Sequence, residues 1–130
     1  MDYRRVVTVD LAYADAVARI KEALAEQGFG VLTEIDMQAT LRDKRGIEME
    51  PYVILGACNP DLAAQALQAE PGVGVLLPCN VVVSAAGDGS AIQVLEPQLM
   101  AAITEQPALQ PMADEAGRRL DAALSALTGH

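Results

Sequence analysis

The segment Tyr52–Val83, YVILGACNPDLAAQALQAEPGVGVLLPCNVVV, decides how this chain folds. It holds the two most apolar runs of the sequence, at residues 52–57 and 73–83, with a short amphipathic stretch between them. Each apolar run leads into a cysteine that is followed by an asparagine, Cys58-Asn59 and Cys79-Asn80. Short apolar runs bounded by turn residues are typical of buried strands. We therefore predict two buried strands joined by a helix.

The start of that helix is specified by Asn59-Pro60-Asp61. Asparagine caps a helix, proline fits the first helical position, and an acidic residue is favourable at the positive end of the helix dipole. Pro71-Gly72 then ends the helix, and the next strand is predicted over residues 73–83. Because proline cannot donate a ladder hydrogen bond, Pro78 predicts a bulge or an edge position in that strand.

The pattern outside this segment predicts three more strands and two longer helices. Alternation indicates strands, helical spacing of apolar residues indicates helices, and glycine-rich stretches indicate turns. The predicted elements are a strand at 3–9, a helix capped by Asp10 and closed by Gly28, a strand at 29–37, a short helix or tight loop at 38–45, a hairpin turn at 86–90, a strand at 91–95 and a helix from Met112 onward. We predict one α+β domain over residues 1–130, a two-layer fold with a mainly antiparallel five-stranded sheet and helices on one face.

Composition excludes several classes of function. The formal net charge of the 130 residues is −9, which argues against binding to nucleic acid or to an anionic membrane surface. No run of apolar residues is long enough for a membrane-spanning helix, and the N-terminus lacks the pattern of an export signal. Two cysteines in such a chain are most simply reduced thiols. We expect a cytoplasmic protein.

The second predicted strand offers a pair of carboxylates. Phe29, Val31, Thr33, Ile35 and Met37 alternate on what we expect to be the core face, so Glu34 and Asp36 fall on the opposite face. Two neighbouring carboxylates can serve acid–base chemistry. A solvated strand face is the simpler explanation of both. If that face is covered, Arg4 or Arg42 are candidate partners.

The residues from Gly28 to Val83 resemble the domain of unknown function 302 family, most clearly in GACNP and LLPCN, which occur in order with a helix between them. The resemblance implies a small prokaryotic α/β domain and a homodimer. It implies no catalytic residues, because the family has no established activity. The family's marked positions correspond to Gly28, Thr33, Asp36, Tyr52, Gly56, Cys58, Asn59, Pro60, Pro78, Cys79 and Asn80.

The thiols are the residues with the most reactive chemistry. Cys58 directly precedes a helix N-terminus, which lowers the pKa of a thiol, and Cys79 follows Pro78 in an apolar strand. Neighbouring strands would allow a disulfide, for which the Cα atoms must lie within about 7 Å, or a soft metal such as Cu(I) or Zn(II). Nothing else supplies ligands at metal spacing, and the only histidine is His130. Inert core cysteines are the simpler interpretation of both.

Three hypotheses follow. The first is a homodimeric small-molecule-binding or interaction module with a pocket near Cys58, Asn59, Cys79 and Asn80. The alternative is a thiol-dependent redox or soft-metal-binding protein that uses Cys58 and Cys79. The third is an acid–base enzyme centred on Glu34 and Asp36. The sequence specifies no cofactor and no recognisable catalytic constellation.

Overall fold

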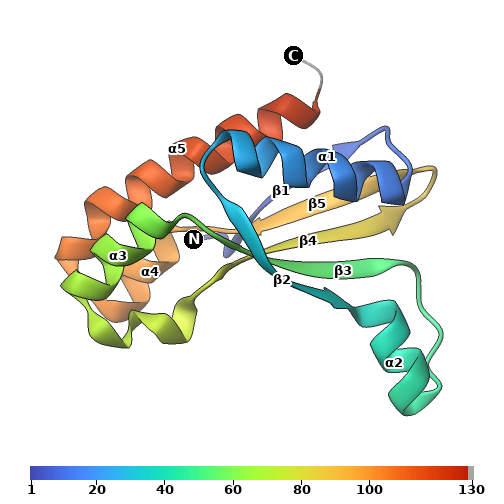
Figure 1. The fold of residues 1–130 in the computed structure, drawn as a ribbon, viewed down its shortest axis with the longest axis horizontal. Coiled ribbons are helices and arrows are strands. Elements are labelled where there is room, and N and C mark those ends of the chain that lie inside the picture. The colour runs from blue at the N-terminus through green and yellow to red at the C-terminus, as the bar shows by residue number, and fades with distance from the viewer. Residues whose placement is uncertain (129–130) are drawn as a thin grey trace.

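A computed structural model of the protein describes residues 1–128, and Figure 1 shows one five-stranded sheet with helices on one of its faces and at one end. The spatial order of the strands is β1-β5-β4-β3-β2, and every pair of neighbours is antiparallel. The strands are β1 (Arg4–Val9), β2 (Gly30–Asp36), β3 (Tyr52–Cys58), β4 (Cys79–Ala86) and β5 (Gly89–Leu95). The predicted α+β fold with a five-stranded antiparallel sheet is confirmed.

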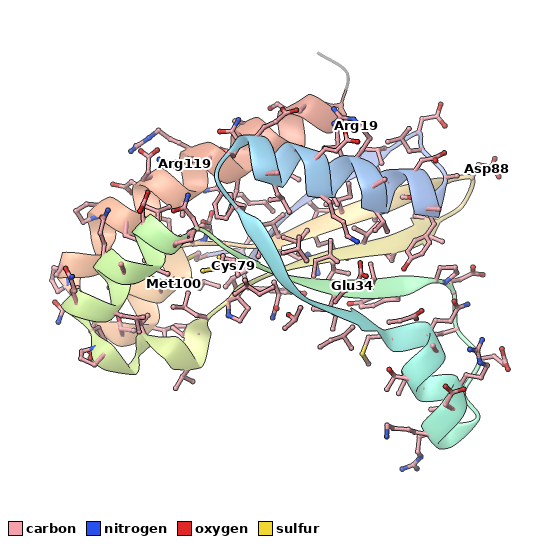
Figure 2. All side chains as sticks on the ribbon, viewed as in Figure 1. Arg19, Glu34, Cys79, Asp88, Met100 and Arg119 are labelled. Atoms are coloured by element: carbon pink, nitrogen blue, oxygen red, sulfur yellow. The ribbon has the colours of Figure 1, made fainter. Side chains whose placement is uncertain are left out.

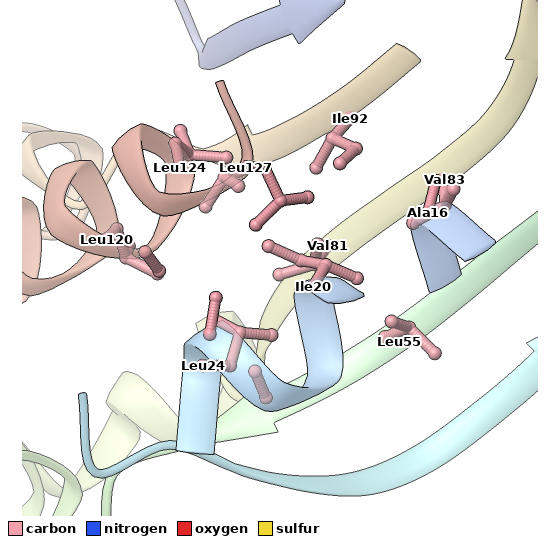
Figure 3. Close-up of a cluster of buried hydrophobic side chains, with 14 of the residues drawn as sticks. Ala16, Ile20, Leu24, Leu55, Val81, Val83, Ile92, Leu120, Leu124 and Leu127 are labelled. Carbon is pink, nitrogen blue, oxygen red and sulfur yellow. The ribbon is translucent and has the colours of Figure 1, made fainter. Parts of the chain in front are cut away.

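Helices α1 (Tyr13–Glu26) and α5 (Gln110–Leu127) lie side by side across one face of the sheet (Figure 1). Since β1 and β2 form opposite edges, α1 carries the chain from one edge to the other. Its apolar stripe and that of α5 meet strand side chains such as Leu55, Val81 and Ile92, all fully buried (Figure 3). The predicted stripe of α5 is confirmed by burial of Met112, Ala116, Leu120, Leu124 and Leu127.

A second apolar cluster lies at the end of the sheet where β3 ends and β4 begins. It is formed around α3 (Pro60–Ala69), α4 (Gln98–Thr104), η2 (Pro107–Leu109) and the first turns of α5. The buried members of this cluster are Leu62, Ala66, Val73, Cys79, Met100, Leu109, Met112 and Ala116. Both cysteines of the chain are therefore at this end of the molecule.

The beginning of the fourth strand was predicted wrongly. Residues 73–78 are not strand, because Pro71–Leu76 forms a short 3-10 helix, η1, and β4 begins only at Cys79. Gly72 and Gly74 have low strand propensity and no side chain that could pack on a neighbouring strand. Pro71 and Pro78 stand at the two ends of this segment. Pro78, in a cis peptide bond, thus precedes β4 and does not interrupt it.

The predicted core face of β2 is also wrong. The strand is an exposed edge, and its pairing with β3 shifts between Val31 and Thr33, which leaves Leu32 as the extra residue of a bulge. A bulge reverses the alternation of side chains. Val31 packs against the core, whereas Thr33 and Ile35 fall on the opposite face, and Ile35 is 45% exposed. Glu34 and Asp36 accordingly lie on the helix-covered side, paired in register with Leu55 and Val53.

Helix starts and ends follow local chemistry. The N-cap of α1 is Ala12, without a side-chain hydrogen bond, so the predicted cap at Asp10 is wrong by two residues. Gly28, with φ of 84°, lies directly after the end of the helix. The segment 38–45 is helical, within α2 (Met37–Arg45), which Asp36 caps and Gly46 ends. This helix projects away from the rest of the molecule and buries none of its residues (Figure 1).

Candidate functional site

Three of the four predicted site residues border one small cavity. Cys58, Asn59 and Cys79 line a space of about 30 Å³ whose remaining walls are apolar, including Leu62, Met100 and Met112. Figure 2 shows Cys79 and Met100 near the end of the strands, where α3 and α4 pack. A volume of this size holds about one water molecule. The cavity is therefore too small for an organic ligand.

The two thiols are free, and Cys58 lies close enough to Cys79 to affect its titration. Burial, together with the negative charge of a Cys58 thiolate, raises the pKa of Cys79 to about 11. A thiol with such a pKa is protonated at neutral pH, and the protonated form is a poor nucleophile and a poor metal ligand. Cys79 therefore behaves as a small apolar side chain of the second core cluster.

Asn59 has the structural role that its position predicts. Its side-chain oxygen accepts a hydrogen bond from the backbone N–H of Leu62 at 3.1 Å, which caps α3. The residue is 5% exposed. A Cβ atom at Gly28 would lie 2.9 Å from the Asn59 amide nitrogen, so glycine lets the α1–β2 turn approach this cap closely. Asn59 thus caps α3 and lies against the turn between α1 and β2.

Asn80 points away from the other three residues. It is exposed at the start of β4 and lines a separate groove on the face of the sheet that α1 and α5 do not cover. Successive side chains of a strand point to opposite faces, so Cys79 and Asn80 are neighbours in sequence but lie on different faces. The fold thus brings Cys58, Asn59 and Cys79 to one cavity and places Asn80 at another.

Glu34 and Asp36 are engaged separately. Lys21 of α1 forms an ion pair with Glu34 at 2.6 Å, and Asp36 accepts a hydrogen bond from the backbone N–H of Ala39 at 2.9 Å. Their negative charges, after burial, help to raise the pKa of Tyr13. Neither Arg4 nor Arg42 is a partner, and Arg42 instead pairs with Asp43. Each carboxylate thus has its own structural partner, although both line one groove together with Tyr13 and Lys21.

The face of the sheet opposite α1 and α5 is named here the open face. In its register Ile35 pairs with Ile54, Ile54 with Val82, and Gln93 with both Val82 and Val6. Its members are Arg4, Val6 and Thr8 of β1, Ala91, Gln93 and Leu95 of β5, Asn80, Val82 and Ser84 of β4, Tyr52, Ile54 and Gly56 of β3, and Thr33 and Ile35 of β2. Among the described residues these strands place no Asp or Glu on the open face, although the chain has 18 acidic residues.

A groove crosses the open face from β1 toward β3. Val82 and Leu95 contribute apolar surface, Tyr3 and Arg4 stand at one side and Tyr52 at the other, and Asn80 and Gln93 add side-chain amides. Its volume of about 380 Å³ falls within the range of small-molecule sites. Apolar surface with a few polar groups is the composition that such sites have.

Sequence reasoning missed Tyr3, Arg4, Gln93 and Leu95 as candidate residues. For Arg4, Gln93 and Leu95 the available signal was the second set of alternating positions in β1 and β5, which contains no carboxylate. Two further observations concern the described chain only. No group of three or more metal-ligating side chains forms within residues 1–128, and none of the helices there is long and apolar enough to cross a membrane.

Comparison with known proteins gives relatives without an assigned activity. A crystal structure of an uncharacterized conserved protein, DUF302, from Bacillus stearothermophilus superimposes with a TM-score of 0.91. The two chains are 31% identical, over 98% of this chain and 99% of the other. None of the curated proteins that were compared matches. The family model described as domain of unknown function DUF302 matches residues 5–127, and the chain therefore belongs to the DUF302 family.

Proposed function

We propose that this protein is a cytoplasmic, homodimeric binding module whose working surface is the open face of its sheet. The observation that carries the proposal is the composition of that face. Val6 is 47% exposed and Ile35 45%, and the register between them is filled by the half-buried Gln93, Val82 and Ile54. An apolar face with tyrosine and without carboxylates has the composition of a protein–protein interface core.

Charge favours a second copy of this chain as the partner. Each chain has a formal net charge of −9, so two copies repel each other over most of their surface. The open face is the extended surface on which this repulsion is weakest, since Arg4 is the only charged side chain that the five strands place on it. Two-fold pairing of these faces would bury the apolar side chains and enclose the groove.

The projecting helix α2 supports the same arrangement. Its residues include Arg42, Lys44 and Arg45 but only one acid, Asp43, so it is positively charged in an acidic protein. It stands beyond the sheet without burying a residue. A helix with this charge and position complements the acidic surface of a second copy.

Sedimentation velocity at micromolar concentration tests the dimer, and the variant Val82→Glu tests the interface. A carboxylate at the centre of the open face would face its own copy across the two-fold axis, so we expect the variant to sediment as a folded monomer. Leu67→Glu, on the exposed surface of α3, is the matched control and should remain dimeric. A monomeric wild-type protein would refute the dimer, and a dimeric Val82→Glu would refute the interface.

The thiol-dependent alternative has one observation in its favour, because Cys58 and Cys79 border the same cavity. The raised pKa of Cys79 weakens it, since the thiolate is the form that binds metals and attacks disulfides. Native mass spectrometry of the purified protein discriminates the two hypotheses. A bound Cu(I) or Zn(II) ion that is lost in Cys58→Ala would favour the thiol protein over the binding module.

A further inference from the structure

Arg4 differs from the other half-buried cations of the chain. Arg5, Arg19, Lys21 and Arg119 each have a carboxylate within ion-pair distance, at 2.6 to 3.3 Å. Within residues 1–128, Arg4 has no such partner, although the protein has twice as many acidic as basic residues. A partly buried guanidinium in so acidic a chain would be expected to have attracted a carboxylate.

The Arg4 side chain is held in position by its neighbour and not by a counter-charge. Its guanidinium carbon lies 4.9 Å from the centre of the Tyr3 ring, and its Nη1 donates a hydrogen bond to the Tyr3 hydroxyl. Its Nε is shielded from solvent and has no hydrogen-bond partner within the described chain. A buried donor without an acceptor costs about 1–3 kcal/mol. The guanidinium is thus positioned in advance by Tyr3 and, because Nε is shielded, its terminal nitrogens are the donors that a ligand can reach.

The residues around Arg4 indicate which kind of anionic group a ligand in the groove would have. A guanidinium binds a carboxylate through two parallel hydrogen bonds. Within residues 1–128 no other cation lines the groove, so a single negative charge is matched better than a phosphate dianion. Val82 and Leu95 provide apolar surface, and the rings of Tyr3 and Tyr52 stand at opposite sides of the groove. Aromatic side chains favour flat apolar ligands.

We infer that the groove on the open face binds a small monocarboxylate with a flat apolar body, and that Arg4 receives the carboxylate. The amides of Asn80 and Gln93 and the hydroxyl of Tyr52 provide hydrogen bonds to further polar groups of such a ligand. This inference deepens the proposed function and rests on it, because the groove is part of the surface proposed to pair in the dimer.

Calorimetric titration with benzoate and with benzyl alcohol tests the inference, since the two probes share a ring and differ in charge. We expect benzoate to bind the wild-type protein at least about tenfold more tightly, the effect of one charged hydrogen-bonded contact. Arg4→Gln should remove that preference without affecting benzyl alcohol, and Arg4→Lys should retain part of it. Arg118→Gln, an equal change of charge on the exposed surface of α5, is the control and should leave both affinities unchanged.

Equal affinity for the two probes, no saturable heat with millimolar benzoate, or an Arg4→Gln protein that still prefers benzoate would each overturn the inference. Sedimentation of the same samples separates it from the dimer proposal. Arg4-dependent binding to a monomer would support the carboxylate site and refute the dimer. A dimer without binding would refute the site alone.

Discussion

The two faces of the sheet are formed by alternating residues of the same strands, yet they differ in burial and in composition. In β3 and β4, Leu55, Val81 and Val83 are fully buried beneath α1 and α5, whereas Ile54 and Val82 are only half-buried on the open face. The covered face supplies the stability of the fold. The open face contains the groove and Arg4, which has no ion-pair partner within residues 1–128. Neighbouring residues of one strand thus lie in two different environments.

The largest expected effect that tests this difference is a pair of truncations in β3. Leu55→Ala leaves a cavity in the main core and should lower the free energy of unfolding by about 3 kcal/mol. Ile54→Ala, on the open face, should cost about 1 kcal/mol or less in the monomer. Urea denaturation at low protein concentration gives both values. Comparable losses for the two variants would show that the open face is packed within a single chain.

The second expected effect depends on pH. The pKa of Cys79 is about 11 in the folded protein, above its ordinary value of 9.0, so the folded state keeps the proton more firmly than the unfolded state. Stability is therefore fully present below pH 9 and is lost as the pH rises through 11, by up to about 2–3 kcal/mol. The difference between wild type and Cys79→Ala in denaturation at pH 8, 9, 10 and 11 isolates this group from other titrating residues. A pH-independent difference would contradict the burial of Cys79.

The smallest effect compares the two asparagines. Asn59→Ala removes the cap of α3 and should cost about 1 kcal/mol, because the backbone N–H of Leu62 loses its acceptor. Asn80→Ala, on the open face, should change stability by less than about 0.5 kcal/mol. Thermal unfolding followed by circular dichroism resolves the two. A larger loss of stability for Asn80→Ala would show that its side chain contributes to folding and does not simply line the groove.

Much of the fold was predictable because its signals are local. The cap at Asn59, the end of α2 at Gly46 and the apolar stripe of α5 depend on neighbouring residues alone. The bulge at Leu32 could not be predicted, since nothing in GVLTEID interrupts the alternation, and the bulge arises from the pairing with β3. One shifted residue was enough to exchange the faces of Glu34 and Ile35.

The candidate site was harder to predict for a related reason. Val81, Val82 and Val83 are chemically equivalent in sequence, so β4 gives no sign of which face the helices cover. The two Cys-Asn pairs attracted attention as repeated motifs, but Asn80 is separated from the thiols by the pleat of the strand. Arg4 stands out only once the ion pairs of the other cations are known.

The bulge in β2 also bears on how far association of this protein can proceed. An unprotected edge strand is a template to which further strands can add, and repeated addition produces fibrils. In β2 the extra residue Leu32, which is 68% exposed, breaks the even spacing of backbone donors and acceptors that a new strand would need. Growth at this edge is thereby discouraged. The proposed pairing through the open face about a two-fold axis would be closed after two copies, so it would cover the apolar surface without leading to polymers.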